Sequence, residues 1–172
     1  MRDPYERLQT ALAGWRLERV PVEELPAAAT EALIDGFDPP TVIALAAMEG
    51  ASWSELRPVA EPVVAELGGP LDLQAARVLV ADAWLHDVAD GRVWPAWSSW
   101  LTEDLLGELG GEYEWFRLAL YDLEFLAAID AADGLAAAVQ TVRARALVVL
   151  ARPVAERLAA TPDAPPLVDR GQ

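Results

Sequence analysis

Proline and glycine are spaced along this chain so that they separate it into segments of helical length. The 172 residues include 13 prolines and 11 glycines. Asp3-Pro4 and Asp38-Pro39 each resemble a helix N-cap followed by proline in the first turn, and Gly50 has the position of a helix stop. Between these points the apolar residues recur at helical spacing and never alternate as in a strand. The sequence therefore predicts an all-α fold.

We expect a single globular bundle of about eight helices, several of them short. Residues 1–160 are predicted to form one domain, and the proline-rich residues 161–172 a poorly ordered tail. The fifth helix, about 71–89, is apolar nearly all round, and the seventh, about 112–133, is strongly periodic, so both should lie centrally. Prolines predict a kink or a broken start in the fourth helix, at Pro58 and Pro62, and a kink at Pro153 in the last helix.

Charge and cysteine content narrow the range of partners. The formal net charge is −15 and the pI about 4.3, which favours neither nucleic acid nor an anionic membrane surface as a partner. A basic protein partner and mimicry of a nucleic acid remain open.

Without cysteine there is no thiol chemistry and no disulfide. No apolar run is long enough to span a bilayer and no N-terminal signal is visible, so we expect a cytoplasmic protein.

The single histidine, His86, is the first candidate for chemistry. It excludes multi-histidine metal sites, including those of the HD-type phosphohydrolases that His86-Asp87 would suggest, and we expect no metal and no cofactor. Asp82, His86 and Asp90 are four residues apart and share one stripe of the predicted fifth helix. Asp82 and His86 could share a metal ion or bind a polar ligand, or a carboxylate could orient the imidazole as a general base. The structural alternative is a hydrogen-bonded seam.

Asp122 is the second candidate. It falls within a predicted apolar stripe formed by Trp115, Leu118, Phe125 and Ile129. A carboxylate in that position must be paired, hydrogen-bonded or protonated, because an isolated buried charge is costly. Either an Asp–Arg pair within the core or a perturbed carboxylate lining a pocket would satisfy this requirement.

A tryptophan cluster is the third candidate and consists of Trp84, Trp94, Trp97, Trp100 and Trp115. Large aromatic side chains with one polar N–H suit a hydrophobic core, a partner-binding surface or the wall of a ligand pocket. The sequence is compatible with all three roles.

One segment of the chain resembles a segment found in other proteins. Residues 25–48 read as a helix, then Gly36, then Asp38-Pro39 and a second helix, and they resemble a segment of uncharacterised small helical proteins of high-GC bacteria. The resemblance covers a small part of the chain and implies a bacterial helical protein with no particular activity.

Two functions are compatible with these features. The first is a non-enzymatic, acidic protein-interaction module that binds a basic partner, for example as an immunity protein or antitoxin. The alternative is a small enzyme or small-molecule-binding protein whose tryptophan-walled pocket carries His86 with Asp82 or Asp122. We expect a protein partner or a homo-oligomer.

Overall fold

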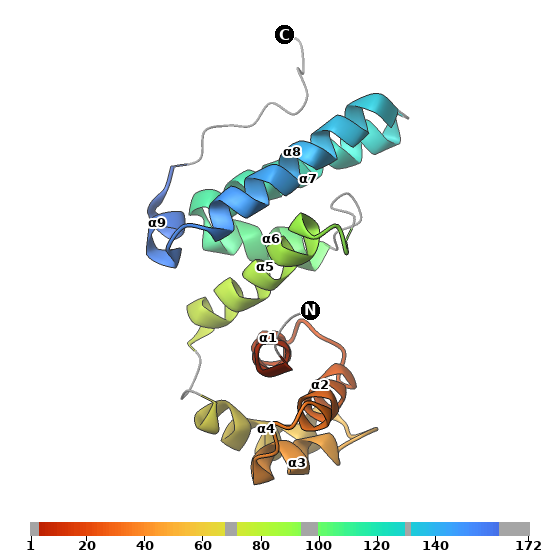
Figure 1. The fold of residues 1–172 in the computed structure, drawn as a ribbon, viewed down its shortest axis with the longest axis vertical. Coiled ribbons are helices and arrows are strands. Elements are labelled where there is room, and N and C mark those ends of the chain that lie inside the picture. The colour runs from red at the N-terminus through yellow and green to blue at the C-terminus, as the bar shows by residue number, and fades with distance from the viewer. Residues whose placement is uncertain (1–3, 68–71, 94–99, 130–131, 162–172) are drawn as a thin grey trace. The chain divides into compact units, whose positions relative to one another are not determined.

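The structure is a computed structural model that describes residues 4–67, 72–93, 100–129 and 132–161 (Figure 1). In these residues every regular element is a helix and there is no strand, so the all-α prediction is confirmed. The helices are α1 (Pro4–Arg16), α2 (Glu24–Ile34), α3 (Pro40–Ala46), α4 (Trp53–Glu66), α5 (Leu73–Ala89), α6 (Trp100–Leu109), α7 (Gly111–Ala128), α8 (Ala132–Leu150) and α9 (Val154–Ala159).

The last expected helix is two helices, which is why nine are described where about eight were predicted. α8 ends at Leu150, and α9 begins at Val154, directly after Pro153. Proline has no N–H to donate to the carbonyl four residues earlier, and its own backbone here is extended, with φ −56° and ψ 143°. The predicted kink at Pro153 is therefore a break.

The chain divides into two compact units, residues 1–80 and 81–172. It passes from the first to the second within α5, at Val80. The expectation that residues 1–160 form one domain stays a prediction.

In the first unit, α1 and α3 each pack against both α2 and α4. Trp15 stacks on Trp53 with ring centroids 6.2 Å apart, and the Tyr5 hydroxyl donates a 2.8 Å hydrogen bond to the carbonyl of Leu67. The centre is one hydrophobic core that includes Leu8, Leu12, Leu25, Leu45, Leu56 and Val63.

The two prolines of α4 do not break the helix, so of the expected kink or broken start the broken start does not occur. α4 runs from Trp53 to Glu66 with Pro58 and Pro62 inside it. The two residues are four apart on the exposed face of α4, so the carbonyls that lose an N–H partner lie on the solvent side of the helix, where water can serve them. α4 begins with a capping box, in which the Glu55 carboxylate accepts hydrogen bonds from the backbone N–H and the hydroxyl of Ser52.

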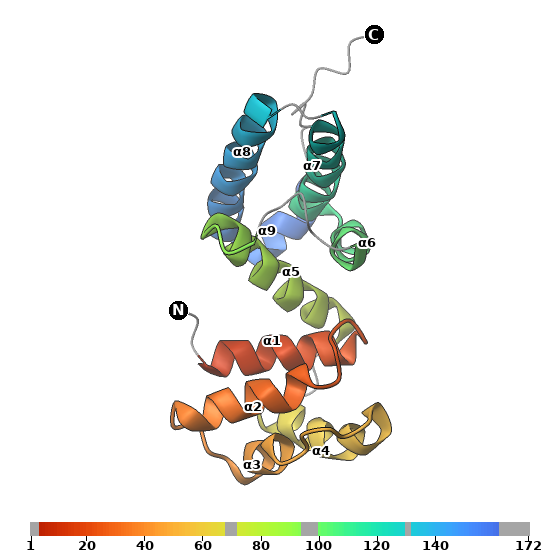
Figure 2. The same cartoon turned by 90° about the vertical axis from the view of Figure 1, so that its right-hand side faces the viewer.

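The second unit is organised around α7, which packs against α6, α8 and α9 (Figure 2). The prediction that α7 lies centrally is confirmed within this unit. Trp84, on the second half of α5, meets the ring of Phe116 edge-on at 6.3 Å, and Trp115 meets it at 5.1 Å. The fully buried side chains of this unit include Leu85, Leu106, Tyr113, Phe116, Leu120, Leu123 and Val142.

The buried face of α7 is rotated from the predicted stripe. Trp115 is buried as expected, but Phe125 and Ile129 are 48% and 55% exposed. The face turned inward instead carries Phe116, Ala119, Leu120, Leu123 and Leu126. Both stripes have helical spacing, so the pattern alone could not separate them.

Some expectations fall on residues outside those described. The expected tail begins at 161, and the structure describes only its first residue; Trp94 and Trp97 are also outside, and for Trp100 only the backbone of α6 is described. Among the described helices, none is both long enough and apolar enough to cross a membrane.

Candidate functional site

A partly buried ion pair lies where α5, α7 and α9 of the second unit meet. The guanidinium of Arg157 donates to both carboxylate oxygens of Asp82, at 2.5 and 2.9 Å. The Tyr113 hydroxyl donates to the same carboxylate at 2.8 Å, and the Arg157 guanidinium lies 5.6 Å from the centre of the Tyr113 ring. Burial, and then the negative charge of Asp82, raise the pKa of the Tyr113 phenol, so this hydroxyl stays a donor at neutral pH. The pair joins three helices.

A second acid, which is buried, lies next to Tyr113 at the start of α7. Glu112 is buried and accepts hydrogen bonds from Arg145 on α8, at 2.5 Å, and from Arg152 just beyond α8. The Arg145 guanidinium also lies 5.6 Å from the centre of the Trp115 ring. Both acids therefore have arginine partners contributed by the C-terminal part of the chain, which gives them a structural role.

Gly111 allows the start of α7 to approach α9 closely. Its φ is +56°, and a Cβ at this position would lie 2.2 Å from the carbonyl oxygen of Arg157. Only glycine can accept this contact without a shift of the backbone.

The expected stripe of Asp82, His86 and Asp90 does not form one site. Asp82 is held by Arg157 and Tyr113, whereas His86 is exposed. Asp90 is also exposed and pairs with Arg92 at 2.6 Å. Asp82, at one end of the stripe, is therefore turned inward, whereas the side chains of His86 and Asp90 lie at the surface.

The remaining candidates that the structure describes are buried or half-buried in the second unit. Asp122 is buried on α7, as its position predicted. Trp84 and Trp115 pack against Phe116. In the described part of the chain, no three histidine or acidic side chains converge to form a metal site.

An open groove lies between α6 and α7. Its volume is about 560 Å³. The groove is lined by Asp104, Gly107, Glu108, Gly110, Glu114, Arg117 and Tyr121. None of the candidates proposed from the sequence lines it.

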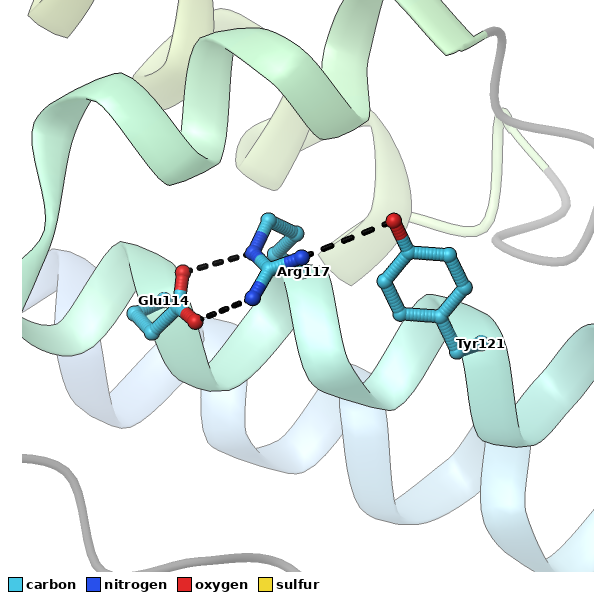
Figure 3. Close-up of polar contacts among 3 residues, drawn as sticks. All are labelled: Glu114, Arg117 and Tyr121. Carbon is cyan, nitrogen blue, oxygen red and sulfur yellow. Dashed lines mark hydrogen bonds and ion pairs between the residues drawn. The ribbon is translucent and has the colours of Figure 1, made fainter.

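Three side chains from successive turns of α7 make one connected row along the groove (Figure 3). Arg117 donates to both carboxylate oxygens of Glu114, through Nε at 2.7 Å and Nη2 at 2.5 Å. Its third nitrogen reaches the Tyr121 hydroxyl at 3.5 Å, and the guanidinium carbon lies 5.5 Å from the centre of the Tyr121 ring. The cation is thus fixed in the groove by an acid on one side and an aromatic ring on the other.

Gly107 on α6 makes room for this row. A Cβ at residue 107 would lie 3.0 Å from Cδ of Arg117. The missing side chain lets the Arg117 stem lie against α6, so the width of the groove depends on a glycine in the middle of a helix.

The electrostatics of the groove favour binding over proton transfer. The hydrogen bonds from Arg117 lower the pKa of Glu114 against a smaller effect of burial, and Glu114 raises the pKa of Arg117. A carboxylate with a lowered pKa remains ionised at neutral pH and is a weak general base. The groove therefore presents fixed charges and an aromatic ring.

Sequence reasoning missed this groove and the arginines of the buried cluster. Glu114, Arg117 and Tyr121 are separated by three and four residues, a spacing that does place them on one helix face. Nothing in the local sequence links Asp82 to Arg157, which is 75 residues away.

No protein-family model, curated protein or solved structure matches this chain. The resemblance of residues 25–48 to small proteins of high-GC bacteria stays a prediction.

Proposed function

We propose that this protein is a non-enzymatic interaction module that binds a basic protein partner through the groove between α6 and α7. The observation that carries the proposal is the charge of the groove lining. Three carboxylates, on Asp104, Glu108 and Glu114, accompany one guanidinium, on Arg117, so the lining has a formal charge of −2. A cationic side chain of a partner would reduce this charge.

The geometry suits a side chain of the arginine type. The groove is open to solvent and offers carboxylate oxygens beside a tyrosine ring, the combination that binds a planar guanidinium. Arg117 already shows this mode of binding between Glu114 and Tyr121. A second guanidinium from a partner would find the carboxylate of Asp104 on the α6 side.

The net charge of the whole chain supports the same partner. At −15, the protein attracts basic proteins over a distance of about 10 Å at moderate ionic strength and accelerates their association. An immunity or antitoxin role against a basic protein is one specific form of this proposal. The alternative, a pocket carrying His86 and Asp82 or Asp122, gains no support from the groove, because these residues do not line it.

The test compares two doubly neutralised variants in affinity capture from native lysate of the source organism. Asp104→Asn with Glu108→Gln removes two charges from the groove. Glu49→Gln with Glu61→Gln removes two charges from exposed positions of the first unit and keeps the same net charge. Quantitative mass spectrometry then measures the basic proteins, those with pI above about 9, retained by each variant and by wild type.

We expect one or a few basic proteins to be captured by wild type and by the control pair, and to be lost from the groove pair. Equal loss from both variants would show that net charge alone retains these proteins, and equal retention would show that the groove has no part in binding. Either outcome would contradict the proposal.

A further inference from the structure

From residue 136 onward the outer face of α8 carries no charged residue, in a chain where 24% of the residues are charged. Opposite this face, α8 packs against α7 through its buried residues. In Figures 1 and 2, no other described helix of the second unit covers the side of α8 that faces away from α7. The exposed residues of this outer face are Ala136, Ala137, Gln140, Thr141, Ala144, Leu147, Val148 and Ala151.

The composition of this face changes from one end to the other. Leu147 and Val148 are 59% and 56% exposed at the C-terminal end. The N-terminal end carries the small residues Ala136 and Ala137. From residue 136 to residue 151 the face is about 22 Å long, since each residue of an α-helix advances 1.5 Å.

We propose that this face is the interface of a homodimer, in which α8 packs antiparallel on α8 of a second copy about a two-fold axis near Ala144. Under such an axis, the large side chains Leu147 and Val148 of each copy lie over Thr141, Gln140 and Ala137 of the other. A two-fold interface requires this self-complementarity, because each contact occurs twice. Alanine at the centre and at both ends lets the two helices approach closely.

Charge also favours a second copy in this orientation. An acidic chain repels its own copies, and this uncharged face is where the repulsion is weakest. Arg143 and Arg145 flank it on either side. Asp133 lies at its N-terminal end, and Arg152, which also binds Glu112, lies beyond its C-terminal end. An antiparallel pair brings these two ends together, whereas a parallel pair would align like charges.

The inference is independent of the groove, because the groove is lined from α6 and α7 alone. A dimer through α8 would present two grooves to a partner. Loss of the dimer would leave each groove intact, so the two proposals can fail separately.

Analytical ultracentrifugation of the full chain up to about 100 µM tests the dimer. Wild type is expected to reach twice its chain mass of 18.6 kDa. Ala144→Glu places two carboxylates together at the axis and is expected to weaken dimerisation at least about 100-fold, because like charges juxtaposed at an interface cost several kcal/mol. Ala65→Glu adds the same charge at an exposed position of α4 and should leave the dimer unchanged.

A cysteine variant reports on the axis directly, since the natural chain contains no cysteine. Ala144→Cys should form a disulfide-linked dimer under mild oxidation much faster than Ala65→Cys, because a disulfide needs Cα atoms within about 7 Å. A wild type that stays monomeric, a dimer that survives Ala144→Glu, or equal cross-linking of the two cysteine variants would each overturn the proposal. The first result would assign the face to a helix of another protein.

Discussion

Replacing Asp82 by asparagine should destabilise the protein by removing the charge that compensates a buried arginine. The Arg157 side chain is 5% exposed, and Asp82, at 22%, is its bidentate partner. Breaking a buried ion pair from one side costs roughly 3–5 kcal/mol, because the remaining charge is left without compensation. Water reaches part of Asp82, so the lower end applies, and we expect a loss of about 3 kcal/mol in the free energy of unfolding.

The assay is urea denaturation monitored by far-UV circular dichroism, and a double variant measures the coupling between Asp82 and Arg157. Combining Asp82→Asn with Arg157→Met removes both charges, and the double variant should recover about 2 kcal/mol of the single loss. Asp90→Asn is the matched control on the same part of the chain. It disrupts an exposed pair with Arg92, and the unfolding midpoint should not move.

Two outcomes would refute this reasoning. If Asp82→Asn shifted the midpoint no more than Asp90→Asn, the buried pair would contribute nothing to stability. If the double variant were as unstable as the sum of its single changes, Asp82 and Arg157 would not be coupled.

Two further predictions come from the same cluster. Because burial raises the pKa of Tyr113 above its usual value of about 10, the unfolded chain loses this proton first. The free energy of unfolding should therefore fall as pH rises above about 10. Tyr113→Phe should reduce this fall and remove the most alkaline step of the ultraviolet phenol titration. A titration that Tyr113→Phe leaves unchanged would contradict this prediction. Gly111→Ala should lower the free energy of unfolding, measured by urea denaturation, by at least about 2 kcal/mol more than Gly36→Ala. Both glycines have positive φ, but only at residue 111 would a Cβ meet the Arg157 carbonyl. Equal losses of stability would show that α9 does not approach this closely.

Most of the fold could be predicted because helix boundaries are set locally. α1 begins at Pro4, as the Asp3-Pro4 signal predicted. The signal at Asp38-Pro39 is displaced by one residue, because Pro39 is the N-cap and α3 begins at Pro40. Prolines were harder to interpret, since their effect depends on which way the unpaired carbonyl points. On the exposed face of α4 two prolines are tolerated, whereas Pro153 separates α8 from α9.

The candidate site was less accessible from the sequence, because its contacts are formed between distant segments. Periodicity placed Asp122 in the interior correctly but chose the wrong face for Phe125 and Ile129, since two overlapping stripes of α7 have the same spacing. Asp82 could be identified as a notable acid but not matched to Arg157. The groove could not be predicted, because it exists only where α6 and α7 pack side by side, and no local sequence pattern specifies that packing.

The claim that the groove binds cationic side chains can be tested directly by nuclear magnetic resonance. A short arginine-containing peptide is titrated into the isotopically labelled protein at low ionic strength, and backbone amide shifts are followed. The proposal predicts saturable shifts concentrated between Asp104 and Tyr121, and their loss in the Asp104→Asn, Glu108→Gln variant but not in the Glu49→Gln, Glu61→Gln control. Shifts spread evenly over the exposed acids of both units, or unchanged by neutralising the groove, would contradict it.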